Sequence, residues 1–144
     1  MSNQIVIIDY GMGNLHSVQK KIKRLGIDPI VSSNPEHIKN ADKIILPGVG
    51  HFKKAMDNLH HLNVIDALNE AVLIKQTPIL GICLGMQLMT KQSEEGNVNG
   101  LGWFDAGVVR FNVKNKLKHK IPHTGWNTVS IVKDSRLMGG ISEN

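Results

Sequence analysis

Residues 78–87, Pro-Ile-Leu-Gly-Ile-Cys-Leu-Gly-Met-Gln, constrain the fold of this chain more than any other stretch. An apolar run headed by a proline is typical of a buried strand, and a helical pattern begins directly after the cysteine. Cys83 is therefore expected on a sharp turn from strand to helix, the layout of a nucleophile elbow. Gly81 and Gly85 fit this layout, because the turn strains the backbone and presses the strand against the helix.

Cys83 is the only cysteine in the chain. At a helix N-terminus its thiolate would be stabilised by unpaired backbone N–H groups, which lower the pKa of the thiol and make it a better nucleophile. These features point to covalent thiol catalysis. The alternative is a small residue buried for packing, and this segment alone does not decide between the two.

The composition is that of an ordinary globular protein, with 41% hydrophobic and 20% charged residues in a chain of 144. That length fits one domain with a real core, and a single cysteine is typical of a reducing compartment. The apolar run 5–8 is too short for a signal peptide or a membrane span. We therefore expect residues 1–144 to form a single cytoplasmic domain with no membrane partner.

The formal net charge of +5 comes mainly from two clusters of basic residues. Residues 20–24 carry four of them in a predicted helix, where we expect a solvated face. Four alternating lysines over 114–120 are typical of a protected edge strand. Because only 4% of the residues are aromatic and no recognisable binding module occurs, we expect no nucleic-acid partner.

Strands and helices alternate through the first ninety residues. The apolar runs predict strands over 5–8, 29–31, 43–46 and 78–82, and helical spacing predicts helices over 15–25, 52–59, 64–72 (with Asn63 as a cap) and 84–89. This rhythm predicts a doubly wound, mostly parallel α/β sheet. Sites in such sheets form at the carboxyl ends of the strands, so the glycine-rich turns after Ile8, after Leu46 and around Cys83 are expected to converge.

From residue 96 onward the pattern changes. Residues 97–102 are typical of a loop, and strands are expected over 107–113 and 126–132, joined by residues 121–125. We expect these residues to form a β-ribbon appended to the α/β core.

A second glycine-rich turn, residues 47–52 (Pro-Gly-Val-Gly-His-Phe), follows a predicted strand and precedes a predicted helix. Acyl transfer to a thiolate needs hydrogen-bond donors where the tetrahedral oxyanion develops. The N–H of Leu84 would be one donor, and an N–H from residues 48–50 is the candidate for the other. A phosphate loop or a plain tight turn is the alternative, although the chain lacks both the dinucleotide-binding glycine pattern and the P-loop pattern.

Four segments, 8–15, 46–52, 81–87 and 122–127, together resemble the triad (class I) glutamine amidotransferases, and within them the glutaminase subunits of imidazole glycerol phosphate synthase. The resemblance implies a flavodoxin-like glutaminase fold. It also implies hydrolysis of glutamine through a γ-glutamyl thioester, with ammonia passing through a tunnel to a synthase (cyclase) partner of the (β/α)8-barrel type. No cofactor and no metal are expected; the adjacent His60 and His61 make a poor metal pair.

The same resemblance implies roles for individual residues. Cys83 would be the nucleophile, with the backbone N–H groups of Leu84, Val49 and Gly50 around the oxyanion. Gly48 and Gln87 would contact the glutamine. The residues implied at the synthase interface or tunnel are Asn14, His123 and Trp126.

This chain departs from the family pattern in two respects. The family supplies its general base and orienting carboxylate as a His-x-Glu pair downstream of the 122–127 motif, and none of the seven histidines here has an acidic residue two positions later. We therefore expect a C-terminally incomplete glutaminase, about the N-terminal two-thirds of the family domain, with little or no activity. It would be a truncated product, a fragment or a frameshifted gene, and a non-catalytic interaction module is the alternative.

The second departure concerns the ammonia acceptor. Residues 94–111, and Thr124 within the 122–127 motif, resemble paralogues found with surface-polysaccharide genes. Those paralogues are thought to supply ammonia for amidation of a nucleotide-linked sugar. The sequence therefore does not identify the molecule that accepts the ammonia. A small flavodoxin-like binding domain, which would bind flavin or nucleotide, has only a fold-level analogy in its favour.

Overall fold

The structure of this chain is a computed structural model, and it describes residues 4–114, 120–133, 135 and 138–139. Its internal contacts divide the chain into two compact units, Met1–Arg110 and Phe111–Asn144. The helices and strands of the described residues lie in the first unit. Our expectation of a single domain over residues 1–144 stays a prediction.

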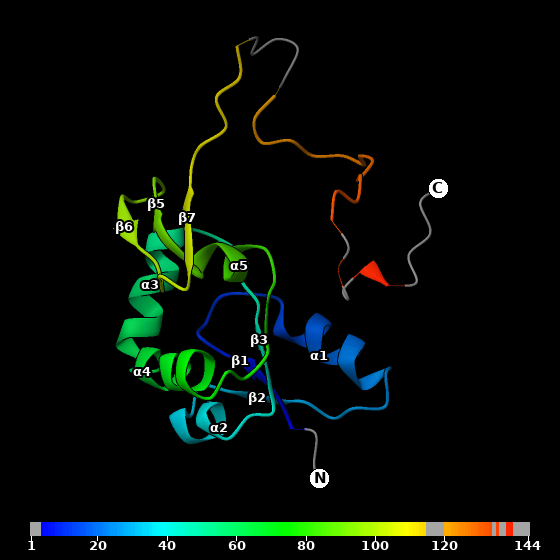
Figure 1. Cartoon of the computed structure of the whole chain (residues 1–144), viewed down its shortest axis with the longest axis vertical. Coiled ribbons are helices and arrows are strands. Elements are labelled where there is room, and N and C mark those ends of the chain that lie inside the picture. The colour runs from blue at the N-terminus through cyan, green and yellow to red at the C-terminus, as the bar shows by residue number, and fades with distance from the viewer. Residues whose placement is uncertain (1–3, 115–119, 134, 136–137, 140–144) are drawn as a thin grey trace. The chain divides into compact units, whose positions relative to one another are not determined.

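A parallel sheet of four strands forms the centre of the first unit (Figure 1). Its strands are β1 (Ile5–Ile8), β2 (Ile30–Ser32), β3 (Lys43–Leu46) and β4 (Ile79–Gly81). They lie in the order β2-β1-β3-β4, and each neighbouring pair runs parallel. This order, with β1 between β2 and β3, is that of a doubly wound flavodoxin-like sheet, so the predicted α/β class is confirmed.

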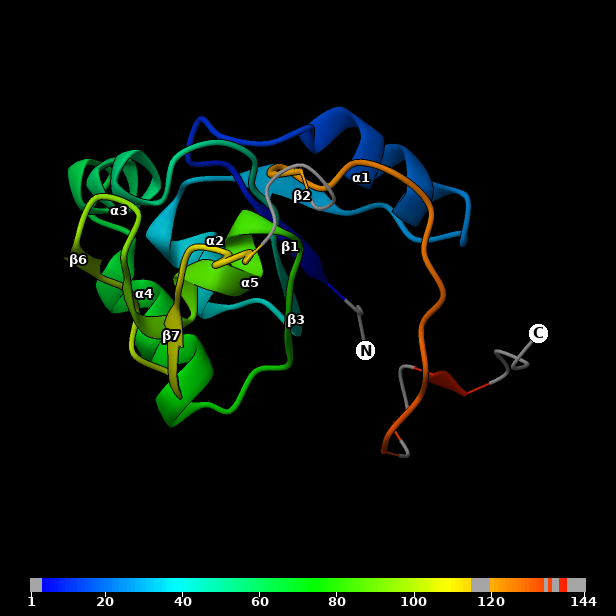
Figure 2. The same ribbon diagram turned by 90° about the horizontal axis from the view of Figure 1, so that it is seen from above.

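The helices pack on both faces of this sheet (Figure 2). They are α1 (Leu15–Lys23), α2 (Pro35–Lys39), α3 (Phe52–His61), α4 (Ile65–Asn69), the π-helix η1 (Glu70–Ile74) and α5 (Leu84–Leu88). On one face Ile7 and Ile45 are buried under the apolar side of α1, and on the other Ile44 and Leu46 pack in one core with residues of α2 to α5. Burial on both faces explains why the strand sequences show no polar alternation.

Asn63 was predicted to cap the helix over 64–72, and this prediction is wrong. Asn63 has a φ of 53° and directly follows Leu62, the C-cap residue of α3, and its N–H donates to the carbonyl of His60 at 3.0 Å. Asparagine tolerates the left-handed conformation that often ends a helix, so Asn63 terminates α3 instead. The next helix begins after Val64 without a side-chain cap and continues into the π-helix.

A second, three-stranded sheet follows α5. It consists of β5 (Thr90–Ser93), β6 (Val98–Asn99) and β7 (Phe104–Val108) in the order β6-β5-β7. β5 pairs antiparallel with β6 and parallel with β7. The predicted loop over 97–102 therefore contains a short strand, and the strand predicted over 107–113 begins and ends earlier in the chain.

The predicted strand over 126–132 is a second error, because these residues form no strand in the structure. Trp126, Val129 and Val132 are exposed, and no described strand lies alongside them to complete a backbone ladder. Apolar alternation without a pairing partner does not make a stable strand. The appended β-ribbon is therefore replaced by the sheet of residues 90–108, and the predicted lysine-protected edge falls partly on Lys116 and Lys118, which lie outside the described residues.

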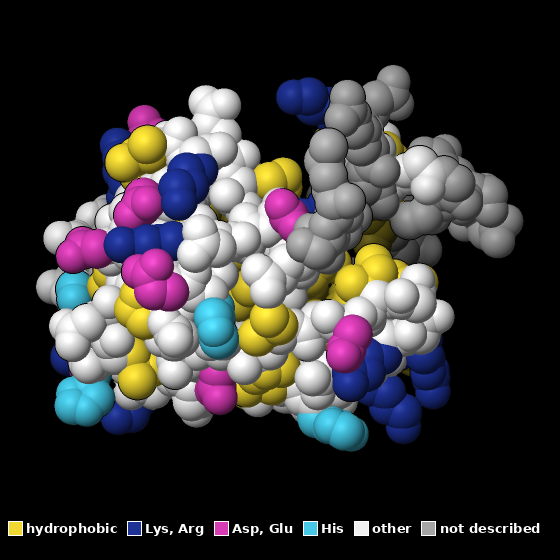
Figure 3. All heavy atoms as spheres, turned by 90° about the horizontal axis from the view of Figure 1, so that it is seen from below, with side chains coloured by type: hydrophobic (Ala, Val, Ile, Leu, Met, Phe, Trp, Pro, Cys, Tyr) yellow, Lys and Arg dark blue, Asp and Glu magenta, His cyan; other side chains and the backbone are white. Residues whose placement is uncertain are grey.

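The surface of the first unit carries charges of both signs, as Figure 3 shows for one face. The basic residues of 20–24 are exposed, as predicted for a solvated face. Lys23 pairs with Asp28 at 2.9 Å, and Lys91 of β5 pairs with Asp105 of β7 at 2.8 Å. Within the described part of the chain, no helix has the length and apolar character needed to cross a membrane.

Glu70, the first residue of the π-helix, pairs with Lys75, which caps the end of the same helix, and with Lys39, the last residue of α2. Its carboxylate lies 3.2 Å from Nζ of Lys75 and 3.3 Å from Nζ of Lys39. The hydrogen bond from Lys75, followed by that from Lys39, lowers the pKa of Glu70. A carboxyl group whose pKa falls on folding adds stability above its unfolded pKa, and this stability is lost as the pH falls through the folded pKa.

We therefore expect Glu70→Gln to lower the Tm slightly at neutral pH, and we expect the difference to disappear as the pH falls below the ordinary glutamate value of 4.5. Thermal unfolding of both proteins across this pH range measures the effect. Asp57→Asn is the comparison variant: the hydrogen bond from Lys53 also lowers the pKa of Asp57, so the pH dependence has the same sign, but this pair lies within α3 and ties no separate elements together. A Tm difference for Glu70→Gln that stays constant at acidic pH would contradict the prediction.

Candidate active site

Cys83 lies between the end of β4 and the first residue of α5, and its side chain is exposed. Its backbone has a φ of +55° and a ψ of −115°, a conformation that side-chain-bearing residues rarely adopt. This is the geometry of a nucleophile elbow, in which a strained turn holds the reactive side chain outward. The alternative of a buried packing cysteine is therefore wrong, whereas the role of Cys83 as nucleophile stays a prediction.

The two glycines beside Cys83 allow the close approach that the elbow requires. A Cβ atom on Gly85 would overlap the backbone carbonyl oxygen of Leu46 at the end of β3. A Cβ atom on Gly81 would lie 2.6 Å from the Cα of Met86. Side chains at these positions would therefore force β3, β4 and α5 apart.

The turn after β3 lies directly beside the elbow. The N–H of Leu84 donates to the carbonyl of Gly48 at 3.3 Å, so the structure brings these two predicted site residues together. In this arrangement the Leu84 N–H already has an acceptor. Val49 is 58% exposed, and Gly50 has a φ of +114°. Gly50 thus adopts a backbone conformation that favours glycine, and Val49 beside it is exposed to solvent.

The turn after β1 meets the turn after β3. A Cβ on Gly13 would lie 3.5 Å from the Cα of Gly48, and one on Gly50 would lie 2.8 Å from the methyl group of Met12. The three turns that were expected to converge therefore do converge. Asn14, predicted at the synthase interface, caps α1 by accepting the N–H of Ser17 at 3.1 Å.

The remaining predicted residues lie at different places. Gln87 is partly buried one helical turn after Cys83, and its N–H donates to the Cys83 carbonyl at 3.2 Å. His123 and Trp126 belong to the second unit and are exposed. Their roles in substrate binding and at an interface stay predictions.

Two residues of this region were not found from the sequence. The hydroxyl of Tyr10 donates to the carbonyl of Pro47 at 2.6 Å, and Glu95 accepts the N–H of Phe52, the first residue of α3, at 2.7 Å. A tyrosine just beyond a buried strand weakly indicates such a hydrogen bond, because the hydroxyl of a buried tyrosine needs a partner. Glu95 lies 43 positions from Phe52, and nothing in the sequence indicates the pairing.

Neither a general base nor a metal site accompanies Cys83 in the part of the chain that the structure describes. No hydrogen bond joins a histidine to Cys83 there, and the described His, Cys, Asp and Glu residues form no group of three that could hold a metal ion.

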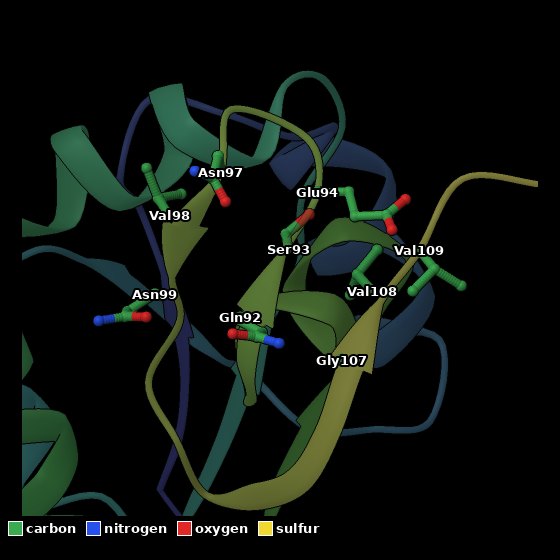
Figure 4. Close-up of a pocket in the computed structure, with 9 residues that line it drawn as sticks. All are labelled: Gln92, Ser93, Glu94, Asn97, Val98, Asn99, Gly107, Val108 and Val109. Atoms are coloured by element: carbon green, nitrogen blue, oxygen red, sulfur yellow. The ribbon is translucent and has the colours of Figure 1, made fainter.

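The second sheet contains a small cavity of about 150 Å³, which is lined in part by Ser93, Glu94 and Val108 (Figure 4). The Ser93 hydroxyl in it already accepts the N–H of Glu95 at 3.0 Å.

Comparison with known proteins yields one family. Residues 6–143 match the family described as "Glutamine amidotransferase class-I". A relative from Methanococcus maripaludis, "Imidazole glycerol phosphate synthase subunit HisH 2", is 49% identical over 97% of this chain and 68% of its own length. The corresponding HisH 1 subunit of Campylobacter jejuni is 48% identical over 96% of this chain and 68% of its own length. HisH of Bacillus subtilis is 46% identical over 93% of this chain and 64% of its own length.

A solved structure supports the same fold. "Crystal structure of glutamine amidotransferase" superposes with a TM-score of 0.62 at 21% identity. The match covers 73% of this chain and 56% of that chain, so this chain spans little more than half of the solved protein's length. The sequence matches and the shared fold lead to the same conclusion: the chain belongs to the class-I glutamine amidotransferase family.

Proposed function

We propose that this chain is the glutamine-hydrolysing part of an imidazole glycerol phosphate synthase, which acts in histidine biosynthesis. The observation that carries the proposal is Cys83, exposed on a strained turn between two close-packed glycines. The names of the relatives from three organisms support the choice of synthase. The partner would be a (β/α)8-barrel cyclase subunit, forming a heterodimeric lyase in the cytoplasm.

In the proposed reaction the Cys83 thiolate attacks the side-chain amide carbon of glutamine. The C–N bond then breaks, the nitrogen takes a proton and leaves as ammonia, and water hydrolyses the γ-glutamyl thioester to glutamate. The oxyanion formed in the first step would take the N–H of Leu84, which must first release the carbonyl of Gly48. A backbone N–H of Val49 or Gly50 would be the second donor.

We propose that these 144 residues do not supply the general base of this mechanism. None of the histidines has an acidic residue two positions later, so no His-x-Glu or His-x-Asp pair is present. We propose that a polypeptide of these residues alone reacts with activated glutamine analogues but turns glutamine over slowly or not at all. A non-catalytic docking module would show neither reaction.

A second candidate function is delivery of ammonia for amidation of a nucleotide-linked sugar. It is favoured by residues 94–111 and by Thr124, which resemble surface-polysaccharide paralogues. In both functions glutamine is the substrate and Cys83 the nucleophile. Assaying ammonia transfer with each candidate synthase partner distinguishes them.

We expect the L-isomer of 6-diazo-5-oxonorleucine, a glutamine analogue, to alkylate Cys83 at least about tenfold faster than its D-isomer, a ratio that one stereospecific hydrogen bond can supply. Intact mass measured over time gives both rates, and peptide mapping locates the label. The D-isomer is the matched control, because its chemical reactivity is identical. Equal rates for the two isomers would show that Cys83 is an exposed thiol without a glutamine site.

A further inference from the structure

Tyr10 lies two residues after the end of β1 and contacts the turn that follows β3. It is the only tyrosine of the chain, and its side chain is 1% exposed. Its hydroxyl donates to the Pro47 carbonyl at 2.6 Å, and its own carbonyl accepts the side-chain amide of Asn58 at 2.9 Å. The backbone of Tyr10 is therefore hydrogen-bonded to α3, while its hydroxyl is bonded to the first residue of the segment 47–50, which we call the oxyanion loop.

The Tyr10 hydroxyl also occupies the space beside Gly48. A Cβ atom on Gly48 would overlap this hydroxyl and would lie 3.1 Å from both the N of Gly85 and the Cβ of Leu84. The carbonyl of Gly48 in turn accepts the N–H of Leu84. A continuous series of contacts thus runs from the Tyr10 hydroxyl through the Pro47–Gly48 peptide to the proposed oxyanion donor.

The hydroxyl of Tyr10 keeps its proton over the whole working pH range. Burial, and to a smaller extent the negative charge of the Cys83 thiolate, raise the pKa of Tyr10 well above its ordinary value. A phenol that does not ionise remains a hydrogen-bond donor to Pro47.

We propose that Tyr10 is a positioning residue that holds the oxyanion loop against the start of α5. This inference rests on the proposed glutaminase function, which it extends by one residue. Without the hydroxyl the Pro47 carbonyl loses its donor and Gly48 gains free space, so the Gly48 carbonyl is no longer held against the N–H of Leu84. Because the N–H of Leu84 must leave this carbonyl before it can meet a developing oxyanion, Tyr10 would thereby hold the donor in its occupied, resting arrangement.

The first test is amide hydrogen exchange in the full chain with Tyr10→Phe. We expect the Leu84 amide to exchange about tenfold faster, a change comparable to one hydrogen bond, and the Leu68 amide, which donates to Val64 in α4, to stay within about twofold. Asn58→Ala is the matched control, because it removes a hydrogen bond to the same residue on the side away from the oxyanion loop. An unchanged Leu84 amide in Tyr10→Phe, or an equal change in Asn58→Ala, would overturn the proposal.

The second test compares two reactions of Cys83 in the same proteins. Acylation by the γ-(p-nitrophenyl) ester of L-glutamate passes through an oxyanion, forms the thioester and releases p-nitrophenolate, whereas alkylation by iodoacetamide develops no oxyanion. We expect Tyr10→Phe to raise the maximal acylation rate about tenfold, because the N–H of Leu84 is released from the Gly48 carbonyl, with the half-saturating ester concentration and the alkylation rate within about twofold. A lower acylation rate, or equal changes in both reactions, would indicate a merely structural role and overturn the proposal.

The two tests separate this inference from the proposed function. If the wild-type chain is alkylated normally but never acylated by the ester, the glutaminase proposal fails. The exchange rate of the Leu84 amide then decides whether Tyr10 positions the oxyanion loop.

Discussion

Replacement of Gly85 by alanine is expected to destabilise the first unit by more than about 3 kcal/mol, which is a large fraction of the stability of a domain of this size. The added methyl group would overlap the carbonyl oxygen of Leu46. A backbone carbonyl in the middle of a sheet has little freedom to move, so α5 would have to shift away from β3. That shift would also separate Leu84 from Gly48 and expose apolar residues of the core.

Urea unfolding followed by circular dichroism measures this effect, and Gly107→Ala is the matched control. Gly107 lies in β7, and a Cβ atom there would have its nearest neighbour at 3.7 Å, an ordinary van der Waals contact. We therefore expect Gly107→Ala to change the free energy of unfolding by less than about 1 kcal/mol. If Gly85→Ala proved as mild as Gly107→Ala, α5 would not press against β3 as described.

The central sheet could be predicted from the sequence because its signals are local. The runs 5–8 and 43–46 are apolar without alternation, which is typical of strands buried on both faces. The turn at Cys83 was equally readable, since a strand pattern, two glycines and a helix pattern follow one another within ten residues. The positive φ of Cys83 is the physical consequence of that layout.

The wrongly predicted strand and the contacts that were missed have a common physical cause, which is that pairing and packing over long distances leave no local pattern. Residues 126–132 have the composition of a strand, but a strand needs a neighbour, and composition does not identify one. The bond from Tyr10 to Pro47 spans 37 positions, and that from Phe52 to Glu95 spans 43. The first links two turns that the sequence predicts separately, and the second links the start of α3 to a residue between β5 and β6. The convergence of the turns could therefore be predicted, but the contacts between these segments could not.

Asn63 illustrates a different ambiguity. Asparagine is favoured both at the start of a helix and, in the left-handed conformation, just after the end of one. Between two helices the residue type alone does not say which neighbour it serves. The structure resolves the question through the φ of 53° and the bond to His60.

Replacement of Cys83 by glycine is expected to stabilise the protein relative to Cys83→Ala while both variants lose all labelling by the glutamine analogue. The loss is complete because no other thiol is present. The difference in stability has a backbone origin. At a φ of +55° and a ψ of −115° a side-chain-bearing residue is strained, whereas glycine adopts this conformation freely.

Cys83→Ala is the appropriate reference because it removes the sulfur but keeps the Cβ atom that causes the strain. Glycine also makes the unfolded chain more flexible, which offsets part of the gain, so we expect a net advantage of about 1 kcal/mol for Cys83→Gly over Cys83→Ala. Urea unfolding of the two variants measures it. A glycine variant no more stable than the alanine variant would mean that the elbow holds no strain, and the thiol would then be exposed for a reason other than the turn beneath it.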